Sequence, residues 1–365
     1  MKLIDIVVGA RPNFIKVASI INSLDAHSSA GGHLGYRLIH TGQHYNARMS
    51  GEFFDQLGIP EPDINLKVGS GTQTEQTGRI MAGYEKVLLA SKCDVCLVVG
   101  DVTSTMACAI TAQKFNIPVA HVEAGIRSGD WSMPEEINRL VTDAVTNWFF
   151  TTSETANENL RRSGVADERL FFVGNTMIDT LLANLSRLRK PSFFDKFNLK
   201  AGEYFVATLH RPANVDNSVG FANLLDAISE STRGLPVIFP LHPRTSKNIQ
   251  TMIKVPSNIH LVDPQPYLEF NFLVKSSKAV ITDSGGITEE TTVMGIPCLT
   301  LRDNTERPET VIIGTNELVG TDPSAIRPVL NKLFSGQWKE GSIPELWDGK
   351  TGYRIVAHLE KLLCE

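Results

Sequence analysis

The chain has no surplus of basic residues and few cysteines, and each shortage excludes a class of protein. Its 365 residues carry a formal net charge of -5 at pH 7. A protein that binds nucleic acid by neutralising phosphates carries an excess of lysine and arginine instead. The five cysteines are odd in number and irregularly spaced, which is not the pattern of a disulfide framework. We therefore expect no nucleic-acid partner and a reducing compartment.

Two of the cysteines, Cys93 and Cys96, form a C-x-x-C pair. A redox-active pair opens a helix, because the helix N-terminus lowers the pKa of the thiol. This pair instead leads into the apolar segment "CLVVGD", which is typical of a strand. We predict two small buried residues here.

Long apolar runs are also missing, and none reaches the roughly 20 residues that a membrane-spanning helix requires. The first residues, "MKLIDIVVGA", could pass for a signal peptide. However, Asp5 interrupts the apolar run, and no small-residue cleavage site precedes "RPNFIK". A first β-strand fits better, so we expect a soluble cytoplasmic protein without a membrane partner.

Two common nucleotide-binding motifs are absent, the G-x-x-x-x-G-K of a P-loop and the G-x-G-x-x-G of a dinucleotide fold. ATP hydrolysis and hydride transfer therefore lose support. His121 and Glu123 are two residues apart, so on a strand they would share a face and could look like metal ligands. A metal site needs three or four ligands, and no clear set follows from the spacing. We favour acid–base use of these groups and expect neither a metal nor another cofactor.

The pattern that is present indicates two α/β domains. The chain is too long for one hydrophobic core. Apolar segments of strand length alternate with segments of helical periodicity in both halves, which predicts parallel sheets wound on both faces. The polar, Pro-containing stretch 191–202, "PSFFDKFNLKAG", is the best linker candidate. The predicted architecture is two doubly wound, Rossmann-like α/β domains that face each other across a central cleft.

Charged or imidazole residues follow nearly every predicted strand. In open α/β sheets, ligands bind beyond the carboxyl ends of the strands. One polar strand end is ordinary, because loops are polar, but the accumulation indicates a site at this edge of both sheets. The strand-end groups are Gly9–Ala10–Arg11, Gly42–Gln43–His44, Gly100–Asp101, His121-x-Glu123, His210–Arg211, His242-x-Arg244 and Asp283–Ser284–Gly285–Gly286.

The stretch 279–290, "AVITDSGGITEE", indicates a strand, a two-glycine turn and a helix. Gly285 and Gly286 would let backbone N–H groups approach an anion closely, and Ser284 could cap the helix with its hydroxyl. The alternative is an ordinary capped helix whose Glu289 and Glu290 complement the helix dipole. This fragment alone leaves both open. A glutamate one turn past the glycines could also reach a ribose, since a carboxylate pairs well with a diol.

Acidic groups would give the site its chemistry. A cleft that held Asp101, Glu123, Glu135 and His210 would contain three carboxylates and one imidazole. Crowded carboxylates raise the pKa of at least one member, which supplies both an acid and a base near neutral pH. On its own, the acidic start of "PEEINR" would be read as dipole complementation.

A series of short segments joins these features into one pattern. They are "GARPNFIK", "TGQHY", "GDVTST", "HVEAGIRSGD", "PEEINR", "GNTMID", "TLHR", "DPQPYLEF", "DSGGITEE" and "TERPE". In this order, from Gly9 to Gly320, they resemble the non-hydrolysing UDP-N-acetylglucosamine 2-epimerases. The resemblance implies a glycosyltransferase-B-type fold and a homodimer. We expect an N-terminal domain at 1–175, on which the terminal helix 351–365 packs back, and a UDP-binding domain at 176–350.

The resemblance also implies a reaction, the reversible conversion of UDP-N-acetylglucosamine to UDP-N-acetylmannosamine for polysaccharide precursor supply. UDP leaves by anti elimination to give a 2-acetamidoglucal, which is reprotonated on the other face before UDP returns. No cofactor takes part. Two alternatives remain open, a 2-epimerase of a related UDP-diacetamido uronic acid and a glycosyltransferase on the same fold.

Particular residues acquire roles by the same resemblance. Asp101, Glu123 and Glu135 match acid–base residues, and His210 matches the active-site histidine. Gln43 lies in "TGQHY", near which several bacterial members bind a second, activating substrate molecule. The positions that match nucleotide, diphosphate or ribose contacts are Arg11, Lys16, His242, Gln265, Phe270, Ser284, Gly285, Gly286, Glu290 and Arg307.

Overall fold

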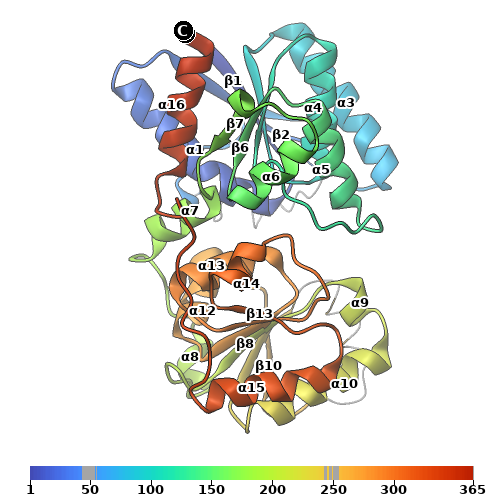
Figure 1. The fold of residues 1–365 in the computed structure, drawn as a ribbon, viewed down its shortest axis with the longest axis vertical. Coiled ribbons are helices and arrows are strands. Elements are labelled where there is room, and N and C mark those ends of the chain that lie inside the picture. The colour runs from blue at the N-terminus through green and yellow to red at the C-terminus, as the bar shows by residue number, and fades with distance from the viewer. Residues whose placement is uncertain (43–53, 55, 242–244, 246–248, 250–254, 365) are drawn as a thin grey trace. The chain divides into compact units, whose positions relative to one another are not determined.

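The computed structural model of the chain describes residues 1–42, 54, 56–241, 245, 249 and 255–364 (Figure 1). The chain forms two compact units. Unit 1 comprises Met1–Ala183 and Glu345–Glu365, and unit 2 comprises Asn184–Pro344. Each unit is an α/β structure with its own parallel sheet, as the alternating pattern predicted. No helix in the described part of the chain has both the length and the apolar character to cross a membrane.

The sheet of unit 1 has seven parallel strands in the order β3-β2-β1-β4-β5-β6-β7. The order reverses between β1 and β4, which makes the carboxyl ends of these two strands a topological switch point, where ligands bind in such sheets. The strands are β1 (Lys2–Val8), β2 (Leu34–His40), β3 (Ile64–Asn65), β4 (Val95–Val99), β5 (Val119–Val122), β6 (Trp148–Thr151) and β7 (Leu170–Phe172).

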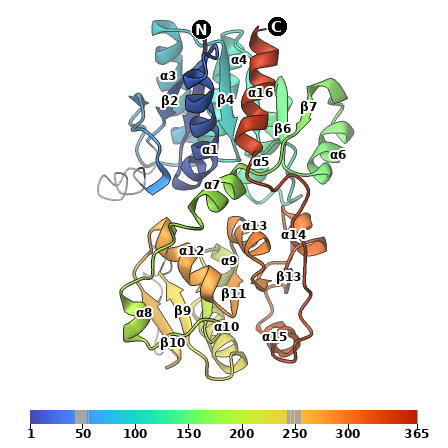
Figure 2. The same cartoon turned by 90° about the vertical axis from the view of Figure 1, so that its left-hand side faces the viewer.

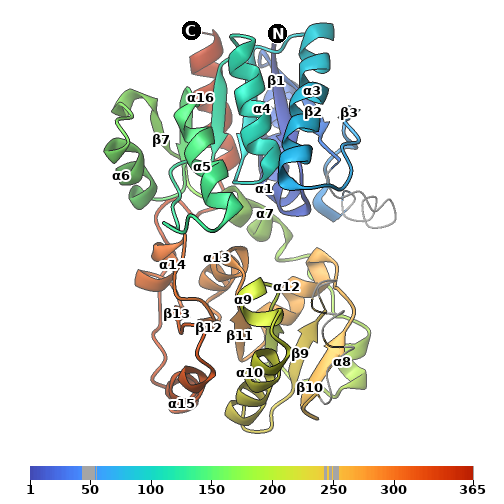
Figure 3. The same ribbon diagram turned by 90° about the vertical axis from the view of Figure 1, so that its right-hand side faces the viewer.

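Helices cover both faces of this sheet, with α1 and α16 on one face and α3, α4 and α5 on the other (Figures 2 and 3). The helices are α1 (Arg11–Ser29), α3 (Gln73–Ala90), α4 (Thr103–Lys114), α5 (Pro134–Ala144), α6 (Glu154–Arg162), α7 (Thr176–Asn184) and α16 (Thr351–Cys364), with a 3-10 turn η1 (Asp167–Arg169).

The terminal helix α16 returns to unit 1 and packs against α1. A side chain at Gly352 would place its Cβ 2.4 Å from the Ser19 carbonyl oxygen, so the close approach of the two helices requires glycine. The predicted domain boundary after residue 175 differs from the division after Ala183. Helix α7 stays with unit 1, where the Thr180 hydroxyl donates to the Ile15 carbonyl at 2.7 Å.

The sheet of unit 2 has six parallel strands in the order β10-β9-β8-β11-β12-β13, with its switch point between β8 and β11. The strands are β8 (Phe205–Thr208), β9 (Val237–Pro240), β10 (Ile259–Val262), β11 (Ala279–Thr282), β12 (Cys298–Thr300) and β13 (Asn316–Leu318). The helices are α8 (Phe193–Lys196), α9 (Pro212–Val215), α10 (Ser218–Ser231), α12 (Tyr267–Ser276), α13 (Gly285–Met294), α14 (Pro308–Ile312) and α15 (Ile326–Phe334), with a 3-10 turn η2 (Pro323–Ala325).

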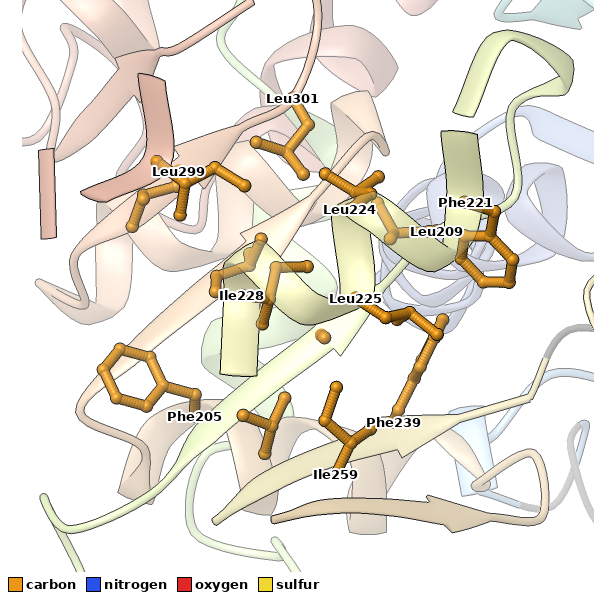
Figure 4. Packing of buried hydrophobic residues seen from close by; sticks show 14 of the residues in the cluster. Phe205, Leu209, Phe221, Leu224, Leu225, Ile228, Phe239, Ile259, Leu299 and Leu301 are labelled. Carbon is orange, nitrogen blue, oxygen red and sulfur yellow. The ribbon is translucent and has the colours of Figure 1, made fainter. Parts of the chain in front are cut away.

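A hydrophobic cluster fills the space between α10 and one face of this sheet (Figure 4). Phe221 of α10, Phe205 of β8 and Phe239 of β9 are all 0% exposed within it. Each such aromatic side chain stabilises the unit by about 2–3 kcal/mol through burial alone. This core fixes the strands whose ends carry the candidate residues of unit 2.

The prediction of a linker at 191–202 is wrong. Phe194 and Leu199 are only 8% and 7% exposed and pack into a hydrophobic cluster of unit 2. The Phe194 ring meets Tyr204 edge-on, with 5.7 Å between centroids. The apolar side chains of the segment are therefore part of a core, despite its polar neighbours.

The prediction of buried thiols at the C-x-x-C pair is confirmed. Cys93 and Cys96 are free thiols that are 7% and 0% exposed. Burial raises the pKa of Cys93 to about 12, so its thiol stays neutral and unreactive at physiological pH.

Candidate active site

The carboxyl ends of β1, β4 and β5 are adjacent in unit 1, because these strands are neighbours in the sheet. Asn13, which is 2% exposed, ties two of these ends together. Its Oδ1 accepts from the Ala10 N–H at 3.0 Å, and its Nδ2 donates to the Val99 carbonyl at 3.0 Å. The turn after β1 is thereby fixed against the end of β4. Sequence reasoning did not identify this residue.

Glu123 follows β5 in a strained conformation. Its φ is +66°, in the left-handed region that residues other than glycine rarely adopt. The carboxylate is buried, and the Lys16 ammonium from α1 contacts its Oε2. A Cβ on Gly100 would lie 3.1 Å from Lys16 Nζ and 3.4 Å from Glu123 Oε2, so Gly100 leaves room for the pair. The sequence predicted a diphosphate contact for Lys16, and the structure gives it a carboxylate partner.

Asp101 follows β4 and is held by two residues of α5. Arg139 donates to Asp101 Oδ2 from Nη2 at 2.5 Å and from Nε at 3.0 Å. Asn138 Nδ2 donates to the Asp101 backbone carbonyl at 2.9 Å. The Asp101 side chain remains 29% exposed, whereas that of Arg139 is 6% exposed. Asp101 is therefore an accessible carboxylate that Arg139 and Asn138 of α5 hold in position.

The adjacent glutamates at the start of α5 have different environments. Glu136 is 2% exposed, and it accepts from the Ser128 and Gly129 N–H groups at 2.9 Å and 3.1 Å and from Arg139 Nη1 at 2.7 Å. Burial raises the pKa of Glu136, but these hydrogen bonds outweigh it and hold the pKa below its ordinary value. Glu135 is partly exposed in the first turn. Only Glu135 is therefore a candidate for proton transfer.

His121 is not available as a metal ligand. Its Nε2 donates to the Gly100 carbonyl at 2.9 Å, and its Nδ1 lies 2.7 Å from Asp143 Oδ1. Glu123 does not share the strand face of His121, because β5 ends at Val122 and the backbone then turns. In the described part of the chain, no group of three or more His, Cys, Asp or Glu side chains could hold a metal ion.

In unit 2, Asp283 orients His210 at the switch point between β8 and β11. The Asp283 carboxylate is 0% exposed and contacts His210 Nδ1 at 2.8 Å. It also accepts from the Arg211 N–H at 2.9 Å and from Asn214 Nδ2 at 3.0 Å. Burial raises the pKa of Asp283, but these donors hold it below its ordinary value. A carboxylate beside Nδ1 fixes the ring and its tautomer, while the His210 side chain stays 41% exposed.

Sequence reasoning listed Asp283 among the strand-end groups but assigned it no role. The signal was available, because a carboxylate directly after β11 lies beside the end of β8 in a parallel sheet. Arg139 and Asn13 gave no comparable signal, since both lie inside helices and act through contacts with residues distant in sequence.

The two-glycine turn begins α13, as predicted, but the serine does not cap it. Ser284 occupies the N-cap position, and its hydroxyl makes no capping hydrogen bond with the described residues. Thr282 closes the turn instead, because its Oγ1 accepts from the Ser284 N–H at 3.0 Å. Ser284, Gly285 and Gly286 are partly exposed. The first N–H groups of a ten-residue helix therefore lie at the edge of the sheet, where an anion binds well.

The interpretation of Glu289 and Glu290 as first-turn dipole partners is wrong. The first turn of α13 contains no acidic residue, because the helix already begins at Gly285. Glu289 is 1% exposed and its carboxylate contacts Arg307 Nε. Glu290 is 3% exposed and accepts from the Tyr267 hydroxyl of α12 at 2.9 Å. Both carboxylates thus face neighbouring elements.

The other predicted residues are distributed as follows. Gln265 lies in the loop before α12, and its Nε2 donates to the Asp263 carbonyl at 2.6 Å. Phe270 of α12 is partly buried against the same hydrophobic cluster as Phe194. Arg11 is the first residue of α1, but its side chain lies outside the described part of the structure, as do all atoms of Gln43 and His242.

Comparisons with known proteins identify the family of the chain. Residues 27–360 match the family model described as UDP-N-acetylglucosamine 2-epimerase. The UDP-N-acetylglucosamine 2-epimerase of Methanocaldococcus jannaschii is 42% identical, with 98% of each chain covered. The UDP-2,3-diacetamido-2,3-dideoxy-D-glucuronate 2-epimerase of Pseudomonas aeruginosa is 38% identical, with 99% of this chain and 100% of the relative covered.

A solved structure extends the similarity to three dimensions. The crystal structure of the M. jannaschii UDP-GlcNAc 2-epimerase in complex with UDP-GlcNAc and UDP has a TM-score of 0.87 and 41% identity. The match covers 99% of this chain and 100% of that one. The two-unit α/β fold, the order of the motifs and the relatives that match over nearly their whole length thus indicate the same family. The chain belongs to the UDP-N-acetylglucosamine 2-epimerase family, whose members are isomerases.

Proposed function

We propose that this protein interconverts UDP-N-acetylglucosamine and UDP-N-acetylmannosamine by inverting C2 of the sugar. The observation that carries the proposal is the pairing of two carboxylates with two different cations at neighbouring strand ends. Asp101 is bound by Arg139, and Glu123 by Lys16. The M. jannaschii relative, named for this activity and solved with UDP-GlcNAc and UDP, supports the same substrate.

The proposed chemistry is an elimination followed by an addition. The C2–H bond breaks, its electrons form a C1–C2 double bond, and the C1–O bond breaks with its electron pair passing to UDP. The resulting 2-acetamidoglucal takes a proton on the opposite face of C2, and UDP re-forms the bond to C1. The C2 proton is weakly acidic, so stabilisation of the departing UDP matters as much as the base.

Two faces of one carbon require two proton-transfer groups, and the cations suggest how they differ. An arginine keeps its protons, so Arg139 supports Asp101 as a fixed carboxylate that accepts a proton. A lysine releases its proton far more readily, so the Lys16–Glu123 pair can carry a mobile one. Glu135 is the third acid–base candidate, at the partly exposed start of α5.

In this proposal, residues of unit 2 bind UDP, which is the leaving group. The N–H groups at the start of α13 hold the diphosphate, and His210, oriented by Asp283, contacts it. Glu290 holds the ribose, while Gln265 and Phe270 contact the uridine. The remaining nucleotide or substrate contacts of the proposal are Arg11, Lys16, Gln43, His242 and Arg307.

Proton exchange at C2 tests the proposal directly. The protein is incubated with UDP-N-acetylglucosamine in D2O without an acceptor, and the sugar signals are followed by NMR. We expect deuterium at C2 of both UDP-sugars and intact UDP-N-acetylmannosamine. If C2 fails to exchange under conditions in which UDP binds, the proposed reaction is wrong. A homodimer is part of the proposal, and light scattering of the purified protein checks it.

A related uronic acid substrate is the second candidate. The 38% identity to the P. aeruginosa UDP-2,3-diacetamido-2,3-dideoxy-D-glucuronate 2-epimerase favours it. The two candidates share one chemistry, so kcat/KM must be compared for the two UDP-sugars. A higher value for the uronic acid would replace the substrate and leave the mechanism in place.

A further inference from the structure

Glu290 is a buried carboxylate that the protein holds by one oxygen. The Tyr267 hydroxyl donates to Glu290 Oε1 at 2.9 Å, and Asn271 Nδ2 reaches the same oxygen at 3.4 Å. The three residues are 3%, 6% and 0% exposed. Among the described residues, no donor is seen for the second oxygen, Oε2. One oxygen is thus anchored to α12, and the other is left for a ligand.

The surroundings of Glu290 contain few charges that could compete with this contact. Burial raises the pKa of Glu290 to about 7, while the hydrogen bonds from Tyr267 and Asn271 act to lower it. The neighbouring Arg307 contacts Glu289 instead. The other ionisable groups on described elements packed against α13 are Glu309 on α14, Cys298 on β12, Glu317 on β13, and Glu269 and Lys275 on α12. None of them contributes to the pKa of Glu290.

We propose that Tyr267 is a positioning residue for the nucleotide: its hydroxyl orients the Glu290 carboxylate and stabilises the ionised form that accepts the ribose hydroxyls. This inference rests on the proposed function, which assigns Glu290 to the ribose. A ribose diol offers two O–H donors, and an ionised carboxylate accepts both, whereas a protonated carboxyl loses part of its accepting capacity. Tyr267 acts through Glu290 and need not touch the nucleotide.

The geometry makes nucleotide affinity dependent on pH. A ligand that prefers the ionised carboxylate binds best above the pKa of Glu290, which lies at about 7. Affinity should therefore rise with pH through neutrality and level off above it. About one tenth of Glu290 is ionised at roughly pH 6 and nearly all at roughly pH 8.5, so affinity differs about tenfold between them. Near neutral pH, binding should release a fraction of a proton.

Tyr267→Phe removes the hydroxyl and keeps the ring. Losing this donor raises the pKa of Glu290 further, because the ionised form loses a charge-assisted hydrogen bond. A tenfold change in the proton affinity of Glu290 is the lower end of what such a bond contributes. The variant should then bind roughly tenfold more weakly than wild type near pH 6, about fivefold near pH 7, and less than twofold near pH 8.5.

Calorimetric titration of the full-length protein with UDP-N-acetylglucosamine measures these ratios. Its two phosphates are both esterified and do not titrate in this range, unlike the terminal phosphate of UDP. Buffers with different ionisation enthalpies report the protons released. Tyr204→Phe is the matched control, because Tyr204 is also buried in unit 2 and its hydroxyl donates to the Leu273 carbonyl at 2.6 Å. The control should keep the pH dependence of the wild type.

Glu290→Gln supplies the second test, since a glutamine cannot ionise. Its affinity should be flat with pH, and adding Tyr267→Phe to it should cause no further pH-dependent loss. An affinity loss in Tyr267→Phe of equal size at every pH overturns the inference, as does a wild type that binds without pH dependence or proton release. In both cases the epimerase proposal still stands. A wild type that binds no UDP-N-acetylglucosamine at any pH overturns the proposed function itself.

Discussion

The adjacent glutamates at the start of α5 give a sharp test, because the same substitution should affect activity at one position and stability at the other. Glu135→Gln and Glu136→Gln both remove one charge and keep the shape of the side chain. Glu135 is partly exposed, while the Glu136 side chain is 3% exposed and surrounded by donors. We expect Glu135→Gln to reduce activity without reducing stability, and Glu136→Gln to reduce stability.

The magnitude for Glu136→Gln follows from its hydrogen bonds. The carboxylate accepts from the Ser128 N–H and hydroxyl and from Arg139 at Oε2, and from the Gly129 N–H at Oε1. A glutamine turned to keep its oxygen toward Ser128 and Arg139 places its NH2 group against the Gly129 N–H. One buried donor is then unsatisfied, and the bond to Arg139 loses its charge. Together these changes cost about 3 kcal/mol. At the partly exposed Glu135, the same substitution should change stability by less than about 0.5 kcal/mol.

Stability is measured by urea unfolding at neutral pH, with circular dichroism as the signal. The pKa of Glu136 is held below its ordinary value of 4.5, so its stabilising effect is fully present above that value. The difference between wild type and Glu136→Gln should therefore be complete at neutral pH and shrink as the pH falls through the acid range. Activity is measured in parallel, and kcat of Glu135→Gln should fall by roughly a hundredfold or more if it transfers a proton.

A Glu136→Gln protein as stable as wild type would refute the assignment of Glu136 to the 128–129 loop and Arg139. Full activity in Glu135→Gln would remove Glu135 from the acid–base group. A stable, fully active pair would refute both assignments, and the difference in burial between the two side chains would then have no functional meaning.

Three further predictions use other contacts. Asp101→Asn should abolish turnover, by at least about a hundredfold in kcat, while calorimetry finds UDP affinity little changed; lost affinity with normal turnover would contradict its assignment. Lys16→Arg should lower kcat more than it raises KM, because an arginine keeps the charge beside Glu123 but not the exchangeable proton; a pure KM effect would leave Lys16 as a substrate contact without a role in proton transfer. Gly352→Ala should lower the unfolding midpoint, since its Cβ would lie 2.4 Å from the Ser19 carbonyl oxygen; an unchanged midpoint would mean that α16 can shift freely on α1.

Local sequence patterns predicted the sheets and the ends of their strands. The structure places Asp101 and Glu123 after strands of the first sheet and His210 after a strand of the second, as the strand-end pattern predicted, while their catalytic roles stay predictions. The helical phase after a glycine turn was less predictable. One of the two interpretations of "DSGGITEE" made its glutamates partners of the helix dipole, but α13 begins at Gly285 and both are buried beyond its first turn. A displacement of one helical turn thus decides whether a carboxylate is exposed to solvent or buried.

Partners were harder to predict than the groups they hold. Arg139 meets Asp101 across 38 positions of the chain, and Lys16 meets Glu123 across 107. No periodicity or spacing relates residues that far apart, since their contact depends on how α5 and α1 pack on the sheet. The linker prediction at 191–202 failed because it relied on local composition. Polar residues outnumber aromatic ones in this stretch, but the few aromatic side chains pack into a core formed by residues distant in sequence.

These long-range partners change the electrostatic environment that the sequence predicted for the proposed acid–base groups. The sequence suggested crowded carboxylates, in which repulsion raises the pKa of one member. The structure gives Asp101 and Glu123 a cation each, and Arg139 is in turn shared with Glu136. Each carboxylate therefore has a cation beside it, which opposes repulsion between the two. In the proposed mechanism the two cations distinguish the groups, because a guanidinium fixes a carboxylate without exchanging protons, whereas an ammonium can both fix it and pass a proton.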